Sequence, residues 1–266
     1  MAEITAAMVK GLREETGLGM MECKKALQEA DGDPELAKDI LRKKGLESVV
    51  KKAGRPTSEG LIAIHVSEDQ TAAAMVEVRC ETDFVARNEV FRAMVRNLAR
   101  MAAEAENPVQ AQPAMQEALQ EVMNKVGENM TYGRGVKILA PRIGTYVHHN
   151  GKVGVLVGVE GQVSDEMLAD LCMHIAFANP MGLTTDDIPV ELVEKEKEIA
   201  THQAMQLGKP ENVVEKIVAG KVNKFLAANA LLEQPFVRDD KKKVKNVLGG
   251  AKVLRYARFA VGADAS

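Results

Sequence analysis

The stretch AAAMVEVR–CETDFVAR occupies residues 72–87 and decides the fold class. Residues 72–79 alternate and are rich in small apolar side chains and Val, which predicts a β-strand. A helical pattern starts at Asn88, a residue type favoured at helix N-caps. Residues 80–87 therefore form a junction between a strand and a helix, where functional residues are often held on a rigid frame. The expected class is α+β.

Phe84 and Val85 are apolar, yet polar and charged residues flank them. In one interpretation Phe84 fills the local core, because burying a large apolar side chain gains roughly 1.5–3 kcal/mol. In the other, Asp83 and Phe84 form an exposed wedge for a partner, since aromatic residues are enriched as interface anchors. The equivalent loop after the second hairpin, residues 161–163, is bland, which favours a special role for residues 80–87.

The composition excludes several classes of protein. The chain has 266 residues, a net charge of −3 and 46% hydrophobic residues, with 14 Met but only 3% aromatic residues. The charge gives no global attraction to nucleic acid or anionic membrane. No apolar run approaches the ~20 residues of a membrane span, and the N-terminus has no secretory pattern. Three scattered cysteines indicate reduced thiols, hence a cytoplasmic protein.

Residues 1–55 are expected to form a three-helix bundle like that of ubiquitin-associated (UBA) domains. Breakers at residues 16–19 and 31–34 separate the three helical patterns. Acidic and basic residues nearly balance here, so the recognition surface should be apolar, with Met20 and Met21 as its candidates. The basic, breaker-rich stretch 49–59 is predicted to be a linker.

The rest of the chain contains a hairpin–loop–helix pattern twice, from Gly60 and from Gly144, which predicts a duplicated core with antiparallel sheets. A charged helix from Val190 to Gln206 and an apolar-lined helix after Pro210 predict a projecting helical hairpin. The alternating residues 253–261 should return as a strand to the second sheet. The predicted domains are residues 1–55, 56–140, 141–180, 181–230 and 231–266.

Catalytic patterns are missing from the sequence. No Gly-rich loop ends in Lys-Ser or Lys-Thr, so the chain should not hold GTP itself. Cys172 and His174 are two apart on a predicted helix and would not share a metal. A thiol enzyme at Cys80 is one alternative, although the adjacent Glu81 should raise the pKa of that thiol. RNA binding through the linker and the lysines at 241–245 is another; a solvated loop is the simpler interpretation.

Four motifs, in order, resemble the bacterial elongation factor Ts family over nearly the whole chain. They are TGLGMMECKKAL at 16–27, CETDFVA at 80–86, VGENM at 126–130 and MHIA at 173–176. The resemblance implies a non-catalytic guanine-nucleotide exchange factor that binds elongation factor Tu in its GDP-bound and nucleotide-free forms and promotes GDP release. It implies no cofactor, no nucleic acid and no membrane, and allows a dimer of heterodimers.

The resemblance also implies the site. Disturbance of the partner's magnesium and phosphate site is assigned to Thr82, Asp83, Phe84 and Val85. Partner binding is assigned to Leu12, Met20, Met21, His148 and His174. The extra residues after His148 leave the register between His148 and His149 open by one, and Phe177 stands where the family often has a small residue.

Overall fold

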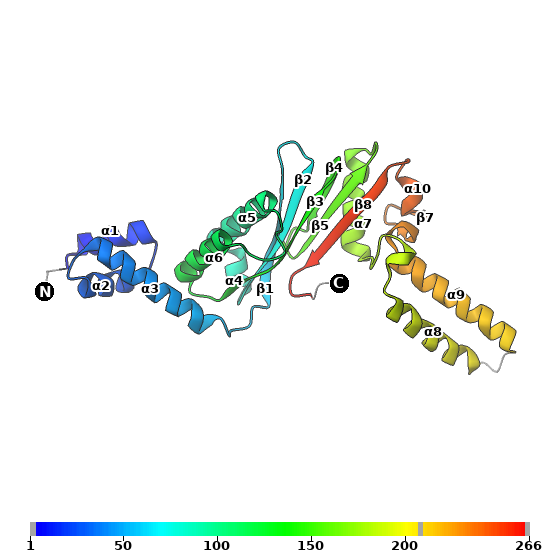
Figure 1. Ribbon diagram of the computed structural model, residues 1–266, viewed down its shortest axis with the longest axis horizontal. Helices are drawn as coiled ribbons and strands as arrows, with labels where there is room; N and C mark the ends of the chain where they lie inside the picture. Colours follow the sequence, from blue (N-terminus) through cyan, green and yellow to red (C-terminus); the bar gives the residue numbers. More distant parts are fainter. Residues whose placement is uncertain (1–3, 207–209, 264–266) are drawn as a thin grey trace. The chain divides into compact units, whose positions relative to one another are not determined.

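A computed structural model describes residues 4–206 and 210–263, with the backbone alone for residues 46–50. It mixes helices and sheets, as the predicted class requires (Figure 1). By their internal contacts, residues 1–65 and 75–136 form one compact unit, and residues 66–74 and 137–266 form another. The five-domain division inferred from sequence stays a prediction.

The first unit begins with three helices, α1 (Ala6–Thr16), α2 (Met20–Glu29) and α3 (Pro34–Lys52). Thr5 caps α1 by accepting a hydrogen bond from the Met8 N–H at 3.3 Å. Gly17 ends α1 at φ 67°, a left-handed conformation that suits glycine. A small core of mostly short side chains holds the helices together, comprising Val9, Leu12, Cys23, Ala26, Leu27, Ala30, Ala37 and Leu41. The likeness to UBA bundles stays a prediction.

Helix α3 is longer than the sequence pattern suggested. It continues to Lys52, through the start of the predicted linker 49–59, because no helix breaker occurs between residues 46 and 53. It packs against α6 (Pro113–Val126), and Gly45 makes the close approach. A Cβ at Gly45 would lie 2.5 Å from Asn124 Nδ2, so only glycine fits there without a shift of the asparagine.

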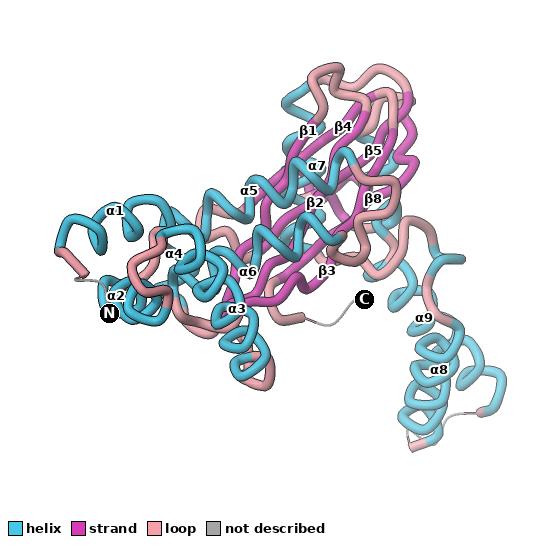
Figure 2. The backbone as a smooth tube through the Cα atoms, turned by 60° about the vertical axis from the view of Figure 1, so that its left-hand side comes forward, coloured by secondary structure: helices cyan, strands magenta, loops and turns pink. Residues whose placement is uncertain are grey.

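A sheet with the strand order β1-β2-β3 belongs mostly to the first unit and is formed by β1 (Glu59–Val66), β2 (Ala72–Cys80) and β3 (Met130–Leu139). Helices α5 (Glu89–Glu104) and α6 lie side by side (Figure 2). Asn88 caps α5 as predicted, and the predicted apolar face of α5 is buried. The junction 80–87 is not the loop expected from sequence, because residues Asp83–Arg87 form a short helix, α4.

The second unit is built on the antiparallel sheet β4-β5-β8, with β4 (Arg142–Val147), β5 (Val153–Glu160) and β8 (Lys252–Ala260). Strand β8 returns beside β5, as predicted for residues 253–261. Helix α7 (Asp165–Ala178), capped by Ser164, packs on this sheet. Each three-stranded sheet thus pairs its returning strand with the second strand of its hairpin. The interpretation as a duplication stays a prediction.

Helices α8 (Val190–Met205) and α9 (Glu211–Asn229) form the helical hairpin, and Ala200, Ala204, Val214 and Val218 are buried between them. The remaining short elements are the 3₁₀ turns Thr185–Asp187 and Leu231–Glu233, the strands β6 (Pro235–Phe236) and β7 (Asp239–Lys243), and α10 (Val244–Val247).

The lysines at 241–245 are therefore not in a loop, because they span β7 and the start of α10. Lys243 and Lys245 both reach Glu233, at 2.7 and 2.6 Å.

Candidate functional site

The turn at Thr82–Val85 presents an aromatic side chain to solvent. Thr82 caps α4, its hydroxyl accepting from the Val85 N–H at 3.3 Å. Val85 and Ala86 are buried and anchor the turn, whereas Phe84 is 80% exposed. The core interpretation of Phe84 is therefore wrong. Exposure of a large apolar side chain to water is unfavourable. A ring held in solvent on an anchored turn is therefore typical of an interface anchor.

Asp83 gives this turn a charge beside the ring. Its Oδ2 lies 2.9 Å from Arg87 Nη2, one helical turn further along α4. Arg87 is largely in solvent and Asp83 is partly exposed, so this pair contributes little to stability and instead restrains the carboxylate. We call the turn Thr82–Val85, with Asp83 and Phe84 at its tip, the wedge turn.

Two sequence motifs meet at the wedge turn. Glu128 accepts two hydrogen bonds from Thr82, from the backbone N–H at 3.1 Å and from the hydroxyl at 2.7 Å. Next to it, the Asn129 N–H donates to Glu81 Oε1 at 2.6 Å. Sequence reasoning did not single out Glu128. The only signal available was that the motifs 80–86 and 126–130 occur together in one chain.

Cys80 lies at the base of this site but is not suited to be a nucleophile. It is buried, and its Sγ donates to the Thr82 carbonyl at 3.2 Å. Burial, with the negative charges of Glu128 and Glu59, raises the pKa of the thiol to about 12. A protonated, enclosed thiol is a poor nucleophile, which disfavours the thiol-enzyme alternative.

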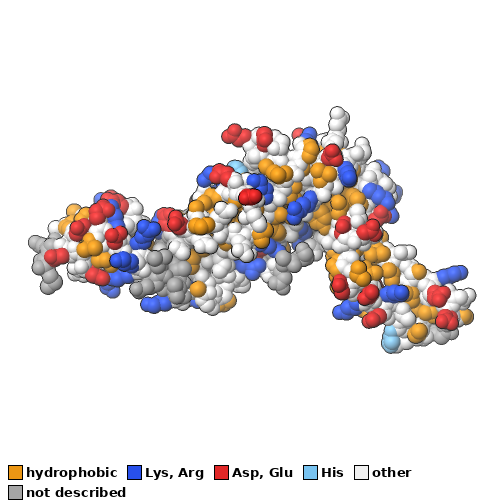
Figure 3. All heavy atoms as spheres, in the orientation of Figure 1, with side chains coloured by type: hydrophobic (Ala, Val, Ile, Leu, Met, Phe, Trp, Pro, Cys, Tyr) orange, Lys and Arg blue, Asp and Glu red, His pale blue; other side chains and the backbone are white. Residues whose placement is uncertain are grey.

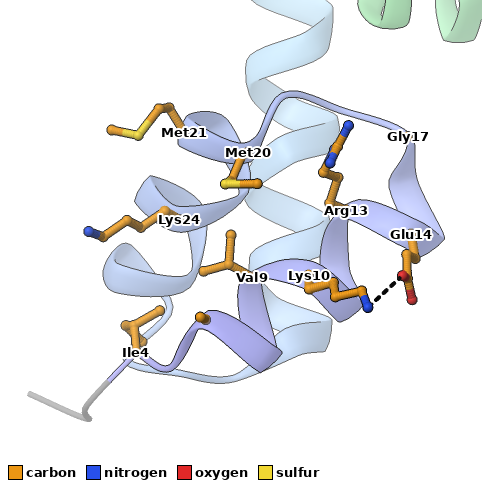
Figure 4. Close-up of a pocket in the computed structure, with 10 residues that line it drawn as sticks. Ile4, Val9, Lys10, Arg13, Glu14, Gly17, Met20, Met21 and Lys24 are labelled. Atoms are coloured by element: carbon orange, nitrogen blue, oxygen red, sulfur yellow. Dashed lines mark ion pairs between the residues drawn. The ribbon is translucent and has the colours of Figure 1, made fainter.

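A groove of about 990 Å³ lies between α1 and α2 (Figure 4). Met20 and Met21 border it and are 57% and 63% exposed. Lys10, Arg13, Glu14 and Lys24 surround the apolar lining with mixed charges, and Figure 3 shows the same mixture over the surface of the bundle. An apolar groove lined by adaptable methionines suits the docking of a partner element.

Leu12 does not belong to that surface. It is 3% exposed and packs in the core of the bundle, so the expected contact of its side chain with a partner is corrected to a packing role. The family resemblance implied this contact, whereas the helical spacing of Leu12 from Val9 marks the inward face of α1.

His148 and His149 lie at the tip of the β4–β5 hairpin. The Tyr146 hydroxyl and His148 Nδ1 are 2.7 Å apart, and the two histidine rings have centroids 4.2 Å apart. His148 is half-buried and His149 is exposed. Both remain candidates for the contact, and the register between them stays open.

His174 is in the interior, only 2% exposed, so direct contact with a partner is also corrected. The Val237 N–H donates to its Nδ1 at 3.2 Å, which leaves Nε2 protonated and donating to Gln234 Oε1 at 2.9 Å. Burial lowers the pKa of His174 below 6.5, although the bond to Gln234 opposes this shift.

Other kinds of site find no support in the described parts of the chain. Among residues 4–45, 51–206 and 210–263, no three His, Cys, Asp or Glu side chains gather as they would to hold a metal ion. No described helix is long and apolar enough to cross a membrane.

The comparisons with known proteins agree on one class, the translation elongation factors. The elongation factor Ts of Nitratiruptor sp. is 45% identical over 97% of this chain and 93% of its own length. The elongation factor Ts of Hahella chejuensis is 44% identical over 98% of this chain and 93% of its own length. That of Aquifex aeolicus is 42% identical over 96% of this chain and 96% of its own length. The profile of the elongation factor Ts family matches residues 81–263. The chain belongs to the elongation factor Ts family.

Proposed function

We propose that the protein is a cytoplasmic guanine-nucleotide exchange factor that binds elongation factor Tu and promotes the release of its GDP, so that GTP can follow. The observation that carries this proposal is the wedge turn, with Phe84 80% exposed on a helix anchored by buried neighbours. An exchange factor needs no catalytic group of its own, because it acts by binding the nucleotide-free state better than the GDP-bound state.

The proposed mechanism divides the work between two surfaces of the first unit. The groove bordered by Met20 and Met21 docks the nucleotide-binding domain and supplies affinity. Asp83 and Phe84 enter beside its switch region and disturb the side chains and waters around the magnesium ion. With that ion displaced, the charge of the phosphates is no longer neutralised and GDP leaves. His148 or His149, in the other unit, would contact a further part of the partner.

The test is the release of fluorescent GDP from elongation factor Tu, measured against the concentration of the factor. Replacing Met20 and Met21 by Ser should raise the half-saturating concentration and leave the maximal rate nearly unchanged. Phe84→Ala should lower the maximal rate. Val190→Ala, at an exposed apolar residue of α8 that belongs to neither surface, serves as the control. Equal exchange by all these variants would refute the proposal.

The magnesium step has a test of its own. Excess chelator removes the metal and speeds GDP release from elongation factor Tu alone. If the factor acts partly by displacing that ion, its fold-acceleration should shrink under chelator. An undiminished acceleration would exclude this step, and the remaining effect would come from movement of the phosphate-binding elements.

A further inference from the structure

One short segment, Asn124–Asn129, contacts both the three-helix bundle and the wedge turn of the proposed exchange site. We call it the bracket. On one side Asn124 lies against Gly45 of α3, and the stem of Lys125 lies against Gly17, where a Cβ would be 3.0 Å from Lys125 Cε. Both glycines belong to the bundle that carries the Met20–Met21 groove.

On its other side the bracket holds the wedge turn. Glu128 and Asn129 supply the bonds to Thr82 and Glu81 described above. The Asn129 side chain, 2% exposed, also donates to the Arg55 carbonyl at 2.8 Å, which fixes the linker between bundle and sheet. The bundle and the wedge turn are thus both attached to one short segment at the end of α6.

Glu128 is the member of the bracket that orients the wedge turn. Its two carboxylate oxygens are used separately, one by the Thr82 N–H and one by the Thr82 hydroxyl. Because that hydroxyl donates to Glu128, its lone pairs are left to accept from the Val85 N–H and cap α4. Bonds to an ionised carboxylate are stronger than neutral ones, so they restrict the turn more than a threonine cap could alone.

We propose that Glu128 is a positioning residue for nucleotide exchange. It does not touch the partner; it holds Asp83 and Phe84 at a fixed direction and distance from the docking groove. This inference rests on the proposed function. Its physical reason is that a displacement of about 1 Å at a reacting site can cost on the order of 100-fold in rate, and an exposed ring entering a partner needs support from behind.

The experiment compares Glu128→Gln with Glu121→Gln in GDP release from elongation factor Tu. Glutamine keeps the shape of Glu128 but offers only one acceptor oxygen, so one of the two bonds from Thr82 is lost. Glu121 lies on the preceding helix, α6, is exposed and pairs with Lys125 at 2.6 Å, so its variant controls for the removal of one charge.

We expect Glu128→Gln to lower the maximal release rate about tenfold, as the loss of a charge-assisted bond predicts. Its half-saturating concentration should stay within about twofold of wild type, as should both values for Glu121→Gln. Thr82→Val, which removes the hydroxyl from the other side of the bond, should reproduce the loss. In a Phe84→Ala background Glu128→Gln should add little, because it acts through the ring.

Two outcomes would overturn the inference. One is an unchanged maximal rate in both Glu128→Gln and Thr82→Val. The other is full additivity with Phe84→Ala, which would mean that Glu128 acts elsewhere, for example through stability alone. Failure of the proposed function is separate, because Phe84→Ala would then itself leave GDP release unchanged.

Discussion

Phe84 and Phe91 carry the same side chain in opposite environments, 80% and 0% exposed. Phe84→Ala should therefore change the free energy of unfolding by less than about 0.5 kcal/mol, whereas Phe91→Ala should cost roughly 3–5 kcal/mol. In GDP release we expect the opposite order, with Phe84→Ala the more damaging of the two variants. Loss of an interface anchor worth about 2 kcal/mol slows the step some thirtyfold. Urea unfolding and the release assay measure the two effects, and a large stability loss in Phe84→Ala would return that residue to the core.

His174 makes the stability of the second unit depend on pH. Its pKa is lowered in the folded state, so the unfolded chain binds the proton more readily. Unfolding therefore becomes easier as pH falls below about 6.5, and the contribution is fully present above that value. Protonation would also place an N–H at Nδ1 against the Val237 N–H, which now donates to it.

This role of His174 is tested by comparing the wild type with the variants His174→Asn and His202→Asn. The melting temperature of the wild type should fall between pH 6.5 and 5, and His174→Asn should lose part of that dependence. His202→Asn, at an exposed histidine on α8, should keep it. The same slope in all three proteins would show that other groups dominate.

At the level of helices and strands, Gly45 sets how closely α3 approaches α6. Alanine favours a helix over glycine by about 1 kcal/mol, but its Cβ would meet Asn124. Gly45→Ala should thus raise the free energy of unfolding little in the wild type and by the full amount, about 1 kcal/mol, in an Asn124→Ala background. Chemical denaturation of the four proteins gives the coupling energy. Equal gains in both backgrounds would show that Asn124 simply moves aside.

These elements were largely predictable where local chemistry decides them. Asn88 acts as the helix cap that the sequence indicated, and Thr5 and Ser164, of residue types also favoured at N-caps, cap α1 and α7. Apolar periodicity located the strands of both hairpins and the inward faces of α5 and α7.

Contacts between distant residues could not be predicted in this way. Glu128 binds Thr82 from 46 positions away, and Lys243 reaches Glu233 across a turn, so the wedge support and strand β7 were missed. The exposure of Phe84 was also undecided, because an apolar residue at a junction fits both the core and the surface. What decides it is that Val85 and Ala86 take the buried places instead.

For the molecule as a whole, a net charge of −3 and the pairing of its basic cluster argue against nucleic-acid binding. Lys242, Lys243 and Lys245 all have carboxylate partners. Replacing the lysines at 241–245 by Gln should leave nucleotide exchange unchanged and cost at most about 1 kcal/mol per exposed pair. RNA binding lost in this variant, with a salt slope reduced by about one for each phosphate contact removed, would contradict this expectation.

The burial of the three cysteines affects how readily the protein is oxidised during storage. Cys23, Cys80 and Cys172 are all buried, and burial raises the pKa of Cys172, like that of Cys80, to about 12. Peroxide and disulfides react with the thiolate, which Cys80 and Cys172 almost never form while the chain is folded, and burial shields all three sulfurs from such reagents. A preparation kept in air should therefore stay free of covalent dimers and sulfenic acid, and the appearance of either would report that the chain has opened.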